Sequence, residues 1–170
     1  MPSSSRTRSG AVPPRPGGLC HGRNGEYLPY LADLSANPDV WNRQAADGGP
    51  DHQPPVLGAE NYLYAFVRNR GTKAAANVTA KAYQARTAGA AVWPTDWVAV
   101  ATPSLSVAGG VVPAGKALVG PFRWTPTFAG GSVLLSVSAD GDPSNADTVN
   151  GPIANVRLAP LDNNVAQRTM

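Results

Sequence analysis

Cysteine and histidine are scarce in this chain, which has one cysteine and two histidines among 170 residues. A single cysteine, Cys20, excludes a disulfide within the chain. A structural zinc site needs four ligands, and Cys20-His21 has only His52 as a further imidazole. We therefore interpret Cys20 as an incidental thiol, and the sequence predicts neither a zinc site nor an organic cofactor.

Long apolar runs are missing as well. No segment approaches the roughly 18 consecutive apolar residues of a membrane-spanning helix, so we expect no membrane span. The N-terminal residues also lack the apolar region of about seven or more residues that a secretory signal peptide needs. The sequence alone therefore predicts no export by the signal-peptide route and leaves the localisation undetermined.

Positive charge is concentrated at the N-terminus. The formal net charge is +3, and residues 1–25 hold four of the 14 basic residues and none of the 11 acidic ones. The remaining 145 residues then carry ten basic and 11 acidic side chains, a balance that does not predict a nucleic-acid partner. Gly, Pro, Ser and Arg make up 17 of those first 25 residues. This composition predicts a flexible basic arm over residues 1–26 and a single folded domain over residues 27–170.

Helical periodicity is absent, whereas strand-like alternation recurs along the folded part. Residues 61–69 alternate most informatively, with Leu63, Ala65 and Val67 predicted to face the core. In residues 132–139 the alternation predicts a strand at the centre of its sheet, with Val133 and Leu135 directed inward. The predicted strands cover residues 27–34, 39–43, 60–69, 77–85, 97–101, 116–124, 132–139 and 164–169. Their number and spacing predict an all-β fold, an antiparallel immunoglobulin- or fibronectin-III-like β-sandwich of seven to eight strands.

Several short motifs carry a family resemblance. Residues 67–72 form a Val-Arg-Asn-Arg-Gly-Thr turn, residues 120–126 form an aromatic strand ending at Pro126, and Asn163-Asn164 open the last predicted strand. Over residues 28–169 these motifs resemble cell-adhesion-related (CARDB-like) bacterial immunoglobulin-type domains. The resemblance implies a non-catalytic β-sandwich used for adhesion, spacing or docking in bacterial surface, secreted or particle-associated assemblies. It favours an extracellular or assembly-associated location and implies no particular binding residues.

The outward face of the strand at residues 61–69 is a candidate protein interface. If Leu63 and Ala65 face the core, then Tyr62, Tyr64, Phe66 and Arg68 share the opposite face. Aromatic residues and arginine are enriched in binding hot spots. The alternatives are that the chain's own N-terminal segment or its 86–115 connection covers this face, or that a bulge turns the aromatics into the core.

Two further groups of residues are candidate sites. Trp93 and Trp97 would form a glycan-stacking platform if both indoles were exposed, whereas buried tryptophans would pin an irregular loop to the sheets. Trp41 and Trp124 lie inside predicted strands and are expected to pack in the core. The second group is Asp140, Asp142, Asn145 and Asp147. These residues form either a calcium site or an ordinary solvated turn.

Catalytic motifs are missing. His21 and His52 lie in segments rich in glycine and proline, which is unfavourable for a positioned base, and the chain has no metalloprotease, phosphate-loop or dinucleotide fingerprint. The sequence therefore predicts a non-enzymatic protein-interaction or structural module whose partner is another protein or further copies of the chain. The alternative is a carbohydrate-binding module that uses Trp93 and Trp97.

Overall fold

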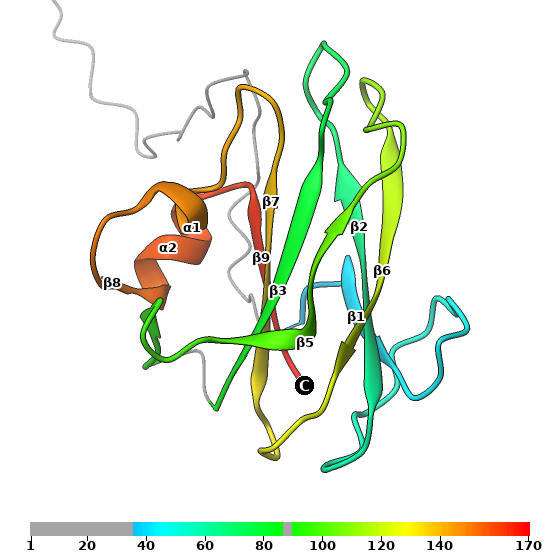
Figure 1. Cartoon of the computed structure of the whole chain (residues 1–170), viewed down its shortest axis with the longest axis vertical. Coiled ribbons are helices and arrows are strands. Elements are labelled where there is room, and N and C mark those ends of the chain that lie inside the picture. Colours follow the sequence, from blue (N-terminus) through cyan, green and yellow to red (C-terminus); the bar gives the residue numbers. More distant parts are fainter. Residues whose placement is uncertain (1–35, 87–89) are drawn as a thin grey trace, which may run out of the picture.

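The computed structural model describes residues 36–86 and 90–170, apart from the side chains of residues 160 and 161. The chain is built mostly of antiparallel strands with two short helices (Figure 1). The elements in chain order are β1 (Val40–Arg43), β2 (Asn61–Arg68), β3 (Thr79–Ala85), β4 (Val92–Trp93), β5 (Val98–Ser106), β6 (Lys116–Trp124), β7 (Ser132–Ser138), α1 (Asn145–Thr148), β8 (Ile153–Ala154), α2 (Asn155–Leu161) and β9 (Val165–Thr169).

The strands form two main sheets. One has the order β1-β2-β6, the other has the order β5-β3-β7-β9, and β4 and β8 pair as a small third sheet. Every printed strand pair is antiparallel. Strand β7 lies between β3 and β9, so the prediction that it is central in its sheet is confirmed. Neither described helix has the length or hydropathy to cross a lipid bilayer.

Both main sheets contribute to one buried cluster. Leu63, Val119 and Phe122 come from the three-stranded sheet, and Val133 and Leu135 come from β7 of the four-stranded sheet. Leu63, Phe122 and Val133 have no exposed surface. The alternation predicted for β2 is confirmed, because Leu63 and Ala65 lie in this cluster and Val67 packs against it. Burial of apolar area on this scale is the main favourable contribution to folding.

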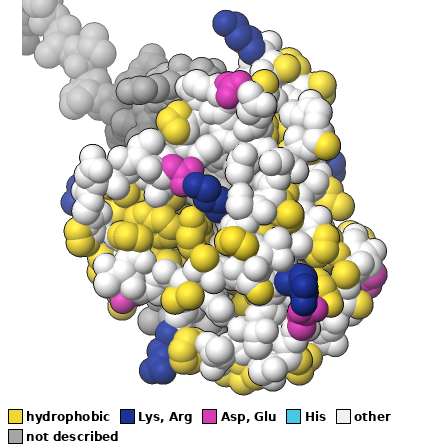
Figure 2. Space-filling view, in the orientation of Figure 1, with side chains coloured by type: hydrophobic (Ala, Val, Ile, Leu, Met, Phe, Trp, Pro, Cys, Tyr) yellow, Lys and Arg dark blue, Asp and Glu magenta, His cyan; other side chains and the backbone are white. Residues whose placement is uncertain are grey.

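A second buried cluster covers the other face of the four-stranded sheet. Leu134 of β7 is fully buried, and it belongs to a cluster with Trp93, Trp97, Leu158 and Ala159. Figure 1 shows α1, α2 and β8 on this outer side of the sheet. In Figure 2 a group of hydrophobic side chains lies on this helix-bearing side of the molecule. Both faces of β7 are therefore packed against other parts of the protein.

Two buried asparagines fix the loop between β1 and β2. The Asn42 amide donates to Gln53 O at 3.0 Å and to Asn61 Oδ1 at 3.2 Å, and it accepts from Trp124 Nε1 at 2.9 Å. The Asn61 amide donates to Val56 O at 3.0 Å. Buried amides are stabilising only when their donors and acceptors are paired. These bonds explain how a long polar loop is held against the end of the three-stranded sheet.

The last strand is tied to the first. Arg168 of β9 donates from Nη1 to Asn37 O at 3.0 Å and to Val40 O at 2.9 Å. Ala36 and Arg168 also form an isolated antiparallel bridge. The two sheets are thus connected along the side where β1 and β9 meet.

Seven predicted strands correspond to observed ones. Six of them differ only slightly at their ends, whereas β5 continues to Ser106, well beyond the predicted end at residue 101. The predicted strand at residues 27–34 and the arm at residues 1–26 lie outside the described residues. The sequence prediction missed β4, β8 and both helices, which have only two to seven residues each. Segments this short do not show a measurable periodicity.

Gly120 interrupts β6 opposite Tyr64. The register between β2 and β6 shifts between Leu63 and Ala65, and Gly120 has φ = 137° in this bulge. A Cβ atom at Gly120 would lie 2.6 Å from Tyr64 Cδ1 and 2.8 Å from Leu63 O. Both the conformation and the lack of space therefore require glycine here.

We expect Gly120→Ala to lower the free energy of unfolding by about 2–4 kcal/mol, since it adds backbone strain to an atomic overlap. Gly130→Ala is the matched control, because Gly130 has φ = 65° but a Cβ there meets nothing within 4 Å. It should cost only about 1 kcal/mol. Urea denaturation of both variants measures the difference, and equal losses would contradict the packing argument.

Candidate functional site

The outward row of β2 is divided between buried and accessible side chains. Tyr64 is only 3% exposed, whereas Tyr62 and Phe66 are half-buried and Arg68 is exposed. None of the four residues belongs to the shared buried cluster. The prediction that Tyr64 belongs to an accessible interface is wrong, because the chain itself covers this ring.

Tyr64 is covered by the loop that follows β1. Trp41 stacks on Tyr64 with ring centroids 5.9 Å apart and an interplanar angle of 18°. The Trp41 indole donates to Gly49 O at 2.7 Å, and the Gly48 amide donates to the Tyr64 hydroxyl at 3.1 Å. Among the described residues, the cover over Tyr64 comes from Trp41 and from the loop at residues 44–54, through Gly48 and Gly49. The N-terminal segment up to residue 35 lies outside the described residues. The sequence analysis missed this contact because it treated Trp41 as a residue of the shared core.

An ion pair holds the covering loop in place. Arg43 donates to both carboxylate oxygens of Asp47, at 3.0 Å from Nε and 2.7 Å from Nη2. Its Nη1 also donates to Asp51 O at 2.9 Å. The hydrogen bonds from Arg43 and from the Gly49 amide lower the pKa of Asp47 far below its ordinary value. Asp47 therefore stays ionised over the whole physiological range.

The accessible remainder of this sheet face is centred on Phe66 and Leu118, and we call it the β2–β6 face. Leu118 lies opposite Phe66 in the register and is 48% exposed. The Lys116 ammonium lies 4.2 Å from the centroid of the Phe66 ring, within the range of a cation–π contact. Arg68 next to it forms a two-point ion pair with Asp39, at 2.7 Å and 2.6 Å.

A second charged group borders the β2–β6 face at Tyr62. The Glu60 carboxylate accepts hydrogen bonds from Arg123 and from the Tyr62 hydroxyl. The hydrogen bonds of Arg123 and Tyr62 lower the pKa of Glu60, and the same Glu60 contact raises the pKa of Tyr62. The face thus combines a central apolar pair with oriented charges of both signs, an arrangement typical of protein interfaces.

Trp93 and Trp97 do not form a platform. They are 5% and 6% exposed and belong to the second buried cluster. Trp93 packs edge-on against Tyr83 at a centroid distance of 4.8 Å, and its Nε1 donates to Ala146 O at 3.1 Å. Neither indole offers a free face to a sugar ring, so the structure corrects the prediction of an exposed glycan site at these residues. Trp41 and Trp124 are buried, as predicted.

The four residues of the predicted calcium site do not converge. Asp140 accepts from Asn77 Nδ2 at 2.7 Å, whereas Asp147 accepts from Lys81 Nζ and from the Ser138 hydroxyl, each at 2.7 Å. Asn145 and Asp147 lie in helix α1, and Asp142 pairs with Ala139 through its backbone. Within residues 36–86 and 90–170, no group of three or more His, Cys, Asp or Glu side chains is arranged to hold a metal ion.

His52 has a structural contact. Its Nδ1 accepts a hydrogen bond from the backbone N–H of Asn42 at 3.2 Å, which requires a neutral imidazole. Burial, and then the positive charge of Arg168, lower the pKa of His52. Cys20 and His21 lie outside the described residues.

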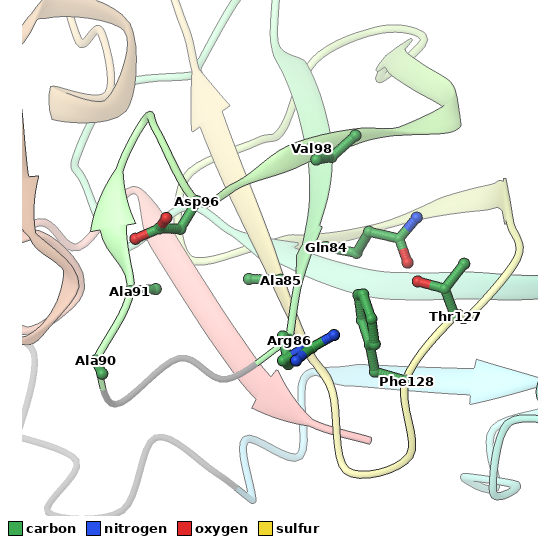
Figure 3. A pocket seen from close by; sticks show the side chains of 9 residues that line it. All are labelled: Gln84, Ala85, Arg86, Ala90, Ala91, Asp96, Val98, Thr127 and Phe128. Carbon is green, nitrogen blue, oxygen red and sulfur yellow. The ribbon is translucent and has the colours of Figure 1, made fainter.

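The sequence analysis also missed a cavity of about 540 Å³ where β3 ends and β5 begins (Figure 3). Its lining is largely apolar and includes Ala85, Ala91, Val98 and Phe128, with Arg86 on one side and Asp96 on another. Val98 and Phe128 are 64% and 39% exposed. No sequence signal indicated that residues from three different segments meet here, although an apolar side chain in the glycine-rich turn at residues 125–131 was a local hint.

The chain has two distant similarities to solved structures. No protein-family model and no curated protein matches the chain. Its fold is similar to a solution structure of GmR58A from Geobacter metallireducens, with 22% identity, a TM-score of 0.44, and coverage of 68% of this chain and 83% of that one. It is also similar to part of the crystal structure of red sea bream transglutaminase, with 15% identity, a TM-score of 0.41 and coverage of 78% of this chain. The chain spans 15% of that transglutaminase chain.

We expect Tyr64→Phe to loosen the covering loop, because the Gly48 amide loses its acceptor. The free energy of unfolding should fall by about 1 kcal/mol, and the Gly48 amide should exchange faster with deuterated solvent. Tyr62→Phe is the control, since the Tyr62 hydroxyl bonds only to Glu60 at the surface, and it should cost less than about 0.5 kcal/mol. Unchanged exchange at Gly48 in Tyr64→Phe would contradict the role of the hydroxyl.

Asp147 should make the attachment of helix α1 dependent on pH. Burial raises its pKa, but the hydrogen bonds from Lys81 and Ser138 outweigh burial, so the folded-state pKa is below the ordinary 3.8. A lowered folded-state pKa stabilises the fold above the ordinary value, and this stabilisation is lost as the pH falls through the folded-state pKa. We expect the free energy of unfolding of wild type to exceed that of Asp147→Asn by about 1 kcal/mol at pH 7. The difference should become progressively smaller below pH 3.8.

Urea denaturation from pH 7 to pH 2.5 measures this difference, in roughly half-unit steps that bracket the titration of an ordinary carboxyl group. Asp142→Asn is the matched control, because Asp142 lies in the same acidic segment but its contacts are made by its backbone. The control should differ little from wild type at every pH. A gap between wild type and Asp147→Asn that stays constant down to the lowest pH would exclude the ion pair as its cause.

Proposed function

We propose that this chain is an immunoglobulin-like β-sandwich that acts as a non-enzymatic protein-interaction module and presents the β2–β6 face to a protein partner. A three-stranded and a four-stranded antiparallel sheet that share one buried cluster support the sandwich assignment. The use of His52 as a hydrogen-bond acceptor for a backbone amide supports a non-catalytic role. The relationship to cell-adhesion-related bacterial domains, and a place in a surface, secreted or particle-associated assembly, remain predictions from the sequence.

One observation carries the proposal: the two sheets are covered unequally. The outer face of the four-stranded sheet is packed beneath a buried cluster that includes residues of α2 and β4. In the described part of the chain, the outer face of the three-stranded sheet is covered only around Trp41 and Tyr64, which leaves Leu118 48% exposed beside Phe66. An apolar centre with a rim of ordered charges has the anatomy of an interaction site.

The charges around this centre favour a protein partner over a purely apolar one. Arg68 and Arg123 are each paired with a carboxylate in the free chain, so they are already oriented before binding. Preorganised side chains lose less conformational freedom on association. Charges of both signs also make the face suitable for selecting one partner and rejecting others by like-charge contact.

The test places a photoreactive p-benzoylphenylalanine at position 118 in cells that normally express the chain. We expect irradiation to give one discrete covalent adduct, whose mass and peptide sequence identify either another protein or a second copy of the chain. The same substitution at Val156, which is 61% exposed on α2, is the matched control and should not give this adduct. A second variant combines the photoreactive residue at position 118 with Lys116→Glu. It should give less of the adduct, because the positive charge over the Phe66 ring is replaced by a negative one.

The proposal is overturned if positions 118 and 156 give the same adducts, because both would then report random collisions. It is also overturned if the position-118 adduct forms equally well in a lysate of the same cells whose proteins have been unfolded in urea before irradiation. Retention of the folded state in each variant is checked by its unfolding midpoint.

A further inference from the structure

The cavity between β3, β5 and the turn after β6 has the size and lining of a ligand site. Its volume of about 540 Å³ lies within the range of roughly 300–1,000 Å³ found for ligand pockets. Ala85 and Ala91 are buried at its base, and Val98 and Phe128 form an exposed apolar rim. Apolar side chains grouped at the edge of a hollow, as Val98 and Phe128 are, are typical of ligand-binding grooves.

Arg86 gives this cavity a specific chemistry. Its guanidinium carbon lies 4.5 Å from the centroid of the Phe128 ring, and Figure 3 shows the two side chains together at one side of the cavity. A guanidinium stacked on an aromatic ring keeps its N–H groups, which lie in its own plane, available for a carboxylate. Among the described residues, Arg86 makes no ion pair and no hydrogen bond with another side chain.

The carboxylate nearest in the lining already has a contact. Asp96 Oδ2 accepts a hydrogen bond from the Val92 amide at 2.7 Å and so holds the turn after β4. Figure 3 places Asp96 at the side of the cavity away from Arg86. The cavity is therefore positive at the end where Phe128 lies and apolar between the two charged residues.

We propose that this cavity binds an extended peptide segment of a partner protein in which an acidic side chain is flanked by apolar ones. The acidic side chain pairs with the fork of Arg86, and one apolar neighbour enters the hollow between Ala85, Ala91 and Val98. Charge complementarity selects this occupant, because Arg86 is the one cation among the described lining residues and is held on an aromatic ring beside an apolar space. Val98 begins β5, a strand at the edge of its sheet, which is the position where an extended peptide adds to a sheet as a further strand. This site does not depend on the β2–β6 face.

The test titrates the ¹⁵N-labelled full chain with synthetic peptides and follows amide and Arg Nε signals by NMR. Three pairs of blocked peptides, acetyl-Ser-X-Glu-X-Ser-amide and acetyl-Ser-X-Gln-X-Ser-amide with X as Leu, Val or Phe, separate charge from shape. We expect at least one Glu peptide to shift the signals of Arg86, Ala91 and Val98, and its Gln counterpart to bind about fivefold more weakly. Because a short peptide makes few contacts, concentrations up to about 5 mM are used.

Arg86→Gln should bring the affinity for the Glu peptide down to that for the Gln peptide. Arg157→Gln is the matched control, since Arg157 is exposed on α2, outside the cavity, and its loss should leave the affinity unchanged. A Phe128→Leu variant should weaken the Glu peptide more than the Gln peptide, because it removes the ring that holds Arg86 but keeps an apolar rim. The proposal is overturned if none of the three pairs shifts the cavity signals, if Glu and Gln peptides bind equally, or if Arg86→Gln binds as wild type does.

Discussion

Strand β7 is apolar on both of its faces, and much of the architecture follows from that. Val133 and Leu135 face the other sheet, while Leu134 faces outward and is equally buried. A sheet with one such strand at its centre cannot leave its outer face in water, because burying a leucine contributes roughly 1.5–3 kcal/mol. The segments around β4, α1, β8 and α2 supply the necessary cover. The three-stranded sheet is under no comparable constraint, and its outer face is therefore where an accessible mixed surface occurs.

The cover over each outer face is attached by different chemistry. On the four-stranded sheet, large apolar side chains exclude water, and the hydrogen bond from Ser144 to Asp162 is itself buried. On the three-stranded sheet, the covering loop is held by hydrogen bonds and by the Arg43–Asp47 ion pair, over a single stacked pair of rings. Since exposed ion pairs are worth little individually, the buried hydrogen bonds of Asn42 and Asn61 contribute more to the attachment of this loop than the Arg43–Asp47 pair does.

The sequence predicted the strands well because long alternating segments are selected by burial, and burial on one face requires period two. It predicted the inward residues of β2 and β7 for the same reason. Tyr64 was misjudged because alternation assigns a side chain to a face without telling what lies on that face. The loop at residues 44–54 covers Tyr64 through backbone atoms of Gly48 and Gly49, and glycine offers no side-chain pattern that indicates such a contact. The Arg86 cavity was beyond reach for a related reason, since its walls come from residues up to 44 positions apart in the sequence, Gln84 to Phe128.

The contact between Arg168 and the carbonyls of Asn37 and Val40 joins positions that are 131 and 128 residues apart. A ribosome adding roughly 5–20 residues per second takes about 6 to 26 seconds between Val40 and Arg168. Throughout that interval β1 lacks the hydrogen bonds from Arg168. Once β7 has been synthesised, it lacks its neighbour β9 until the last residues are added, so the nascent chain presents an unpaired strand edge. The final closure of this domain is therefore expected only after synthesis of β9.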